Sequence, residues 1–195
     1  MKSNYKPIFA AVSIAALATM AFAVAGAKSG LQPGDTVSAF GPKHVTGADA
    51  KSSTCLVCKY GTTAAVQVWV NGDSTDNVIR IAKELEGTIK KQGANNLKAF
   101  VIFIKPKGTS EKVISDQLSA IASQNGLKNV ALTFVDGAKG SGVASYKINV
   151  SSEVKNTVMV YQNRKVSANF VNLKADAQGL KSLKSSVMKA SGKDN

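Results

Sequence analysis

The chain has 195 residues and carries 25 Lys or Arg against 12 Asp or Glu, which gives a formal net charge of +13 at pH 7. Only two of the basic residues are arginines, Arg80 and Arg164, and the lysines are scattered along the chain. Specific nucleic-acid recognition depends largely on arginine forks and stacking aromatic side chains, so the composition argues against a specific nucleic-acid partner. It predicts a solvated basic surface, with binding of a polyanion as the alternative.

The first 27 residues have the order of a secretory signal peptide. Lys2 and Lys6 precede a mostly apolar run, residues 8–24, and small residues then recur in A-x-A spacing around Ala25 and Ala27. We expect cleavage near Ala25 or Ala27, export to the periplasm or the extracellular space, and no stable membrane span afterwards. A membrane anchor is the alternative, but the run is rich in alanine and barely long enough to cross a bilayer.

Removing residues 1–27 would take away Lys2 and Lys6 and lower the net charge from +13 to +11. We expect residues 28–190 to form one domain, because a chain of this length can bury a sizeable core. Residues 191–195 read as a polar tail. The sequence does not indicate an oligomeric state.

Residues 64–104 contain a strand, a helix and a second strand. The run AAVQVWV (64–70) is short, apolar and rich in β-formers, which predicts a strand. Ser74, Thr75 or Asp76 can cap a helix whose apolar residues recur at helical spacing and which ends at Gly93. The run LKAFVIFI (97–104) is almost continuously apolar, as expected for a strand covered on both faces.

The same alternation continues to the end of the chain. Thr109 or Ser110 can cap a second helix that ends at 125–126, and VALTFV (130–135) predicts a third strand. We expect a flexible loop at 137–142 and one helical turn at 143–148. Strands at 157–162 and 165–170 form a hairpin, followed by a closing amphipathic helix between Leu173 and Val187. This order predicts an α/β domain with parallel early strands and an antiparallel final pair.

Three segments resemble the thioredoxin fold in its exported peroxiredoxin-like or TlpA-like form. PGDTVSAF (33–40) resembles the G-D-x-x-P-x-F start of those proteins. NVALTFVDGAKGSGVASYKI (129–148) resembles their extra strand, Asp turn and short helix, and TVMVYQNRKVSANF (157–170) resembles their terminal hairpin. The resemblance covers roughly residues 31–190. It implies a three-layer α/β/α sandwich whose mixed sheet ends in a C-terminal antiparallel hairpin.

The only two cysteines, Cys55 and Cys58, form a C-x-x-C that is displaced from the position these proteins use. Thioredoxin-like enzymes place the motif after the first core strand, where residues 71–74 here read Asn-Gly-Asp-Ser. The two ends of a strand such as 64–70 lie about 20 Å apart. Unless residues 53–63 fold back, the cysteines are expected at the edge of the sheet opposite the usual active site.

Two other features of thioredoxin-like enzymes are missing. Lys155 and Asn156 precede the first hairpin strand, where those enzymes have a cis-proline, so we expect a trans peptide before Thr157. The peroxidatic P-x-x-x-[TS]-x-x-C motif is also absent. The usual geometry of thioredoxin or peroxiredoxin activity is therefore not predicted.

The chemistry of Cys55 and Cys58 leaves three alternatives. In an oxidising compartment the pair can be a structural disulfide, although a loop this short gains only about 2 kcal/mol in the chain-entropy model. It can be a working dithiol, because Lys51 and Lys59 flank it and favour a thiolate. It can contribute to a metal site with His44, but structural zinc needs four ligands, and we expect neither a metal nor another cofactor.

The remaining candidates point to structural roles. His44 is expected at the surface or as a capping residue. Asp73 and Ser74 are expected to cap a helix, and Trp69 and Phe100 to lie in the core.

The sequence therefore predicts an exported thioredoxin-like protein that performs thiol–disulfide exchange or redox sensing through Cys55 and Cys58, with a protein thiol or disulfide as partner. The alternative is a non-catalytic envelope domain that binds another molecule and keeps the disulfide as a local clasp.

Overall fold

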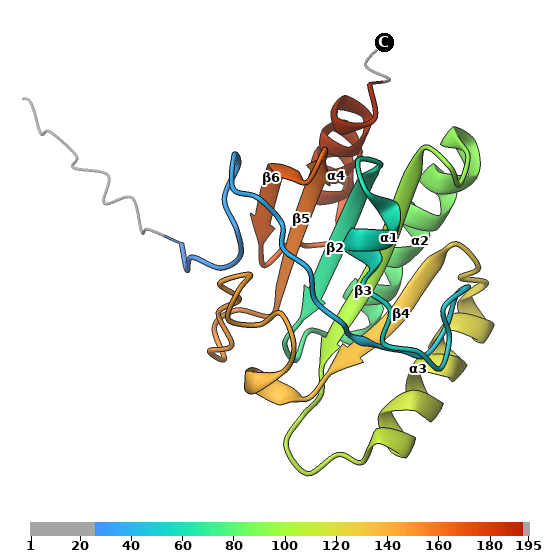
Figure 1. The fold of residues 1–195 in the computed structure, drawn as a ribbon, viewed down its shortest axis with the longest axis vertical. Helices are drawn as coiled ribbons and strands as arrows, with labels where there is room; N and C mark the ends of the chain where they lie inside the picture. Colours follow the sequence, from blue (N-terminus) through green and yellow to red (C-terminus); the bar gives the residue numbers. More distant parts are fainter. Residues whose placement is uncertain (1–25, 193–195) are drawn as a thin grey trace, which may run out of the picture.

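The computed structural model describes residues 26–192, so most of the predicted signal peptide and the last three residues of the predicted tail lie outside the described residues. The strands are β1 (Lys43–His44), β2 (Ala64–Val70), β3 (Leu97–Ile104), β4 (Val130–Val135), β5 (Asn156–Gln162) and β6 (Lys165–Val171). They form one sheet in the order β1-β4-β3-β2-β5-β6 (Figure 1). β2, β3 and β4 are parallel, while β1, β5 and β6 each pair antiparallel with their neighbours.

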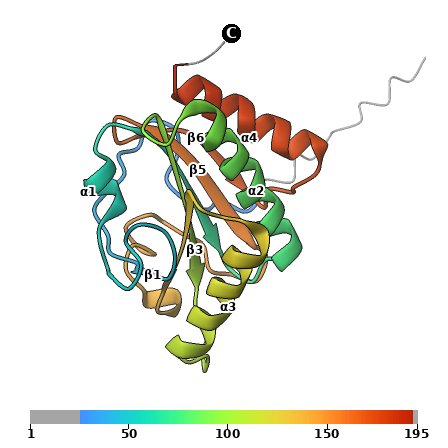
Figure 2. The same ribbon diagram turned by 90° about the vertical axis from the view of Figure 1, so that its right-hand side faces the viewer.

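One face of the sheet is covered by three long helices (Figure 2). They are α2 (Thr75–Gln92), α3 (Glu111–Asn125) and α4 (Ala177–Ala190). Each begins after a side-chain cap, Ser74, Ser110 or Asp176, which accepts a hydrogen bond from a backbone N–H of the first turn. Their apolar stripes join one face of the strands in a single core. No helix within residues 26–192 is long and apolar enough to cross a membrane.

The opposite face is covered by a thinner layer. It consists of α1 (Leu56–Tyr60), the extended segment 29–40 and the turn-rich segment 136–154, which includes the 3₁₀ helix η1 (Gly137–Lys139). Figure 2 places α1 across the sheet from α2, α3 and α4. The predicted three-layer arrangement is therefore confirmed, with one outer layer made mostly of irregular chain.

Aromatic side chains hold this thinner layer on the sheet. The ring of Phe40 stacks on Trp69 at 5.2 Å between centroids and meets Tyr146 edge-on at 5.0 Å. The buried Gln67 accepts a hydrogen bond from Trp69 Nε1 at 3.0 Å, and the Tyr146 hydroxyl donates to the Ser38 carbonyl at 2.5 Å. Burial raises the pKa of Tyr146 to about 12, so the hydroxyl keeps the proton that it donates.

The strands predicted at 64–70, 97–104 and 130–135 are confirmed with those bounds, and each hairpin strand is one residue longer than predicted. β1 and α1 were not predicted, because two and five residues are too short to show a period. Residues 143–147 lie in turns, and the backbone N–H of Tyr146 donates to the Gly142 carbonyl at 2.9 Å, which is the spacing of one helical turn. Trp69 and Phe100 are buried as predicted.

A buried carboxylate joins α2 to the turn before β4. The Glu86 side chain accepts hydrogen bonds from the backbone N–H groups of Lys128, Asn129 and Val130 at 3.1, 2.8 and 3.0 Å. Burial by itself would raise the pKa of Glu86, but these hydrogen bonds outweigh it and the pKa is lowered. The ionised carboxylate therefore stabilises the fold above its unfolded-state pKa, and this stability is lost as the pH falls through the lowered pKa.

We expect Glu86→Gln to lower the free energy of unfolding at pH 7 by about 2 kcal/mol. A neutral amide oxygen accepts the three backbone N–H groups less strongly than the carboxylate, and the new NH₂ group faces the Asn129 side-chain amide, which donates to the other carboxylate oxygen in the wild type. The deficit should shrink as the pH falls below about 4, where the wild-type carboxylate also becomes neutral. Urea unfolding at a series of pH values measures this. Glu84→Gln is the control, because within residues 26–192 the Glu84 carboxylate accepts no hydrogen bond. A deficit that stays constant with pH would contradict the assignment.

Candidate functional site

The two cysteines form a disulfide at the start of α1, with their Cα atoms 5.3 Å apart. Cys55 is the N-cap residue, and its Sγ accepts a hydrogen bond from the backbone N–H of Cys58 at 3.1 Å. Cys58 is exposed, whereas Cys55 is half-buried against the core of the thinner layer. The two residues of the disulfide therefore differ in exposure, and Cys58 is the more exposed.

Buried residues fix α1 on the sheet. Leu56 and Val57 are 0% and 2% exposed, so the residues between the two cysteines face the core. At the end of the helix, the Tyr60 ring lies 6.3 Å from that of Phe100, and Lys98 Nζ lies 5.1 Å from the Tyr60 centroid. This packing fixes the disulfide on the face of the sheet, while Cys58 stays exposed.

The segment before α1 folds back over the sheet. Ser53 lies against Gly41, where an added Cβ would come within 2.8 Å of the Ser53 carbonyl oxygen. Gly41 follows Phe40, which stacks on Trp69 near the end of β2. From the sequence, the cysteines were expected at the edge opposite the usual active site unless residues 53–63 fold back. They do fold back, and the cysteines lie over a face of the sheet. Figure 1 places α1 beside the first half of β2, away from the turn where β2 ends.

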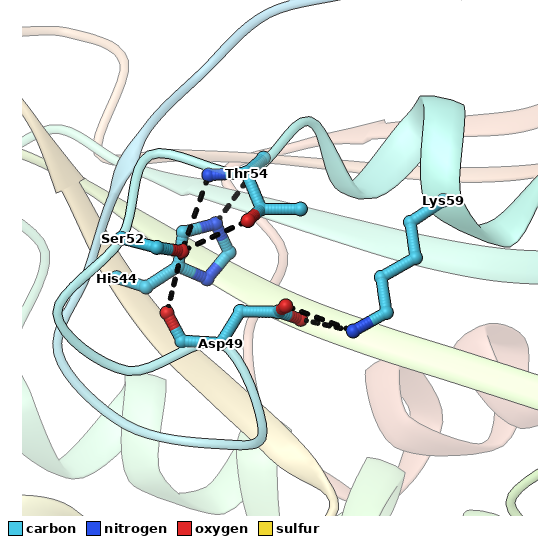
Figure 3. A network of polar contacts seen from close by, with 5 residues as sticks. All are labelled: His44, Asp49, Ser52, Thr54 and Lys59. Atoms are coloured by element: carbon cyan, nitrogen blue, oxygen red, sulfur yellow. Dashed lines mark hydrogen bonds and ion pairs between the residues drawn. The ribbon is translucent and has the colours of Figure 1, made fainter.

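A polar network joins the loop before the cysteines to α1 (Figure 3). Lys59 Nζ contacts both carboxylate oxygens of Asp49, at 2.8 and 2.7 Å. The Ser52 hydroxyl donates to the Asp49 carbonyl at 2.7 Å and lies 2.9 Å from the Thr54 hydroxyl. Sequence reasoning did not select Asp49, Ser52 or Thr54, because isolated polar residues in a loop carry no spacing pattern.

His44 completes the network and corrects a prediction. It was expected at the surface or as a capping residue, but it is only 4% exposed. Its Nε2 lies 2.9 Å from the Thr54 carbonyl oxygen, and because a carbonyl can only accept, Nε2 carries the proton. β1 places this ring at the edge of the sheet by pairing with β4. His44 therefore holds the residue immediately before Cys55.

The electrostatics around the disulfide differ from the sequence expectation. Lys59 was expected to favour a thiolate, but its charge is paired with Asp49, whose side chain is only 16% exposed. Lys51 is exposed and lies in the left-handed region, with φ at 66°. The lysines next to the motif therefore supply less positive charge to the sulfurs than the sequence suggests, and the Cys58 N–H is the close donor.

The position that thioredoxin-like enzymes use for their cysteines holds a set of structural hydrogen bonds. Asp73 Oδ2 accepts from Asn77 Nδ2 at 2.7 Å and from Asn156 Nδ2 at 2.6 Å. The Asn156 amide also bonds both backbone groups of Leu173, and Ser74 caps α2 as predicted. Residues 26–192 contain no cis peptide bond, so the peptide before Thr157 is trans, as predicted.

A metal-ligand set does not gather within residues 26–192: no group of three or more His, Cys, Asp or Glu side chains is placed to hold an ion. The sulfurs of Cys55 and Cys58 are bonded to each other, and Nε2 of His44 is bonded to Thr54. These three side chains do not form the partial ligand set that the metal alternative requires.

Comparison with solved structures identifies the fold. A proposed protein disulfide isomerase from Bacteroides thetaiotaomicron superimposes with a TM-score of 0.60 at 12% identity, covering 85% of this chain and 95% of that one. A proposed thiol:disulfide interchange protein DsbE from Chlorobium tepidum gives 0.60 at 11% identity, covering 83% and 99%. The fold is thioredoxin-like. A thiol peroxidase from Chromobacterium violaceum shares it, with a TM-score of 0.55 at 13% identity over 82% of this chain and 87% of that one.

No protein-family model matches the sequence, and no curated protein matches it either. At identities of 11–13% the structural matches establish the thioredoxin-like fold.

We expect His44→Ala to loosen the loop before the disulfide. The variant loses the bond to the Thr54 carbonyl and leaves a cavity, which should lower the free energy of unfolding by about 2 kcal/mol. Amide hydrogen exchange of residues 52–58 should accelerate more than that of β2. Ser53→Ala, at an exposed position whose hydroxyl makes no hydrogen bond within residues 26–192, is the control. Unchanged exchange at 52–58 would show that His44 does not hold this loop.

Proposed function

We propose that this chain is an exported thiol–disulfide exchange protein that works through Cys55 and Cys58. The observation that carries the proposal is the asymmetric disulfide: one exposed position, one half-buried position and a backbone N–H donor 3.1 Å from the inner sulfur. A four-residue loop is a poor staple, worth about 2 kcal/mol in the chain-entropy model. A reactive role accounts for this spacing better than stability does.

Exchange begins when a thiolate of the partner attacks Cys58 Sγ, the accessible sulfur. A new S–S bond forms between the partner and Cys58, the Cys55–Cys58 bond breaks, and Cys55 Sγ leaves as a thiolate. The Cys58 N–H already directed at that sulfur stabilises the negative charge. The direction of net electron flow depends on the partner.

The second step resolves the mixed disulfide. A second thiolate of the partner attacks the partner sulfur that is bonded to Cys58, and Cys58 leaves as a thiolate. The partner is then oxidised by two electrons, and the two cysteines of this chain are reduced. The reverse sequence oxidises this chain. Because Leu56 and Val57 stay buried, Cys55 and Cys58 remain close together throughout, and the disulfide can re-form.

The second candidate function is a non-catalytic envelope domain with a structural disulfide. The observation that favours it is the use of Asp73, Asn77 and Asn156 in structural hydrogen bonds where thioredoxin-like enzymes place their chemistry. In that case the disulfide only closes the first turn of α1. The two functions differ in the redox potential that they require.

A redox titration, read by mass shift after thiol alkylation, distinguishes them. Under the exchange proposal the pair titrates reversibly with a midpoint between about −120 and −270 mV. A pair that stays oxidised below about −300 mV is a structural clasp, which contradicts exchange.

The two cysteines should also differ as single variants. Cys55→Ser leaves the exposed Cys58, which should form a mixed disulfide with oxidised glutathione faster than the half-buried Cys55 left by Cys58→Ser. Both variants should lose dithiol exchange activity, while Ser53→Ala keeps it. Equal rates of mixed-disulfide formation would contradict the assignment of Cys58 as the attacked position.

Export is the other part of the proposal, supported by the basic start, the apolar run and the A-x-A spacing of residues 1–27. Expression of the full chain in a bacterium should give a periplasmic or secreted product whose intact mass corresponds to an N-terminus near Gly26 or Lys28. Lys2→Glu with Lys6→Glu should slow processing, because the positive start is removed. A cytoplasmic product that keeps residues 1–27 would contradict export.

A further inference from the structure

A groove of about 970 Å³ lies where the three parallel strands end, and no residue of α1 lines it. Its walls are the turns that follow β2, β3 and β4, and the segment before β5 closes it. In the sheet, β3 lies on one side of β2 and β5 on the other. The connection after β2 leads to β3, whereas the connection after β4 leads back past β2 to β5. The direction in which strands are added reverses here, which makes this edge a topological switch point. In open α/β sheets, ligands bind at the carboxyl ends of the strands at such points.

The groove carries excess positive charge. Lys105, Lys107, Lys139 and Lys155 line it, with Asp136 as the single carboxylate. That carboxylate is already paired, because Lys43 Nζ lies 3.1 Å and Lys105 Nζ 3.8 Å from its oxygens.

Lys107, Lys139 and Lys155 are exposed and have no ion-pair partner within residues 26–192. Three uncompensated ammonium groups around one concave surface attract anions.

The groove also has an apolar side. Ile104, Pro106 and Ala138 contribute to its lining together with Val150. Val150 is 37% exposed, and among residues 26–192 only Val113 is a more exposed large hydrophobic side chain. Water contact with this surface is unfavourable, at about 25 cal/mol for each Å² that a ligand could cover. An occupant with both a negative group and an apolar body satisfies both sides of the groove.

We propose that this groove binds a small amphiphilic anion, a carboxylate or phosphate ester with a compact apolar body. The volume lies in the range of about 300–1,000 Å³ that is typical of small-molecule sites. A nucleic acid fits less well, because the lining contains no arginine and no aromatic side chain for base stacking. The site shares no residue with the disulfide, so this proposal is independent of the exchange function.

Matched probes separate the two halves of the site. Phenyl phosphate carries both the anion and the apolar ring, inorganic phosphate carries only the anion, and benzyl alcohol carries only the ring. In NMR titrations of the chain from residue 28, we expect phenyl phosphate to bind about tenfold more tightly than either partial probe, which corresponds to about 1.4 kcal/mol. Shifts should centre on 104–108 and 136–139. Phenylacetate, titrated in parallel, distinguishes a carboxylate from a phosphate ligand.

Two variants test the groups directly. Lys107→Glu with Lys139→Glu should weaken phenyl phosphate binding at least tenfold, whereas Lys83→Glu with Lys184→Glu, at exposed positions on α2 and α4, changes the net charge equally and should leave it within about twofold. Val150→Ser should weaken phenyl phosphate and phenylacetate but leave inorganic phosphate unchanged. Thermal unfolding confirms that each variant is folded, and a Cys55→Ser, Cys58→Ser double variant should bind like the wild type.

The proposal is overturned if neither phenyl phosphate nor phenylacetate shifts the groove resonances up to about 10 mM, weaker than any useful site. It is also overturned if phenyl phosphate binds no more tightly than inorganic phosphate. The same holds if the two double lysine variants weaken binding equally, because binding would then depend only on the overall charge of the protein.

Discussion

The main constraint on this molecule is that its sheet has two apolar faces and only one of them is covered by long helices. β2 is buried along its whole length, and its side chains point alternately into two separate hydrophobic clusters. Burying such a surface is the main favourable term in folding. The second face therefore has to be covered by residues 29–60 and 136–154, which have little regular structure of their own. The position of the C-x-x-C follows from this requirement, because Leu56 and Val57 are part of that cover.

This constraint explains which parts of the fold could be predicted from the sequence. β2, β3 and β4 are continuous apolar runs between turn residues, and α2 and α3 have clear caps and stripes, so their bounds could be read directly. The cover on the second face could not. Its contacts, such as Phe40 on Trp69, join residues far apart in the chain, and no local period records them.

Only part of the candidate site could be predicted, again because contacts between residues far apart in the chain leave no local pattern. Cys55 and Cys58 were found by their spacing, and the pairing agrees with it. Their surroundings depend on long-range placement: Asp49 neutralises Lys59, and the buried His44 holds Thr54, because a two-residue strand brings His44 to the edge of β4. The difference in access between the two cysteines arises from the packing of α1, which no sequence pattern showed.

One scaffold can therefore support different tasks at the disulfide and at the carboxyl end of β2. In a thioredoxin-like enzyme, the dithiol takes up the carboxyl end of this strand. Here that end holds Asp73, Asn77 and Asn156 in mutual hydrogen bonds, which fix the turn without a reactive group. A rigid turn with no nucleophile leaves the neighbouring groove free to hold an anion, and the lysines around it need not be shared with sulfur chemistry. Under the two proposals, ligand binding and thiol exchange use different residues, because neither cysteine lines the groove, so each can be removed by substitution without removing the groups of the other.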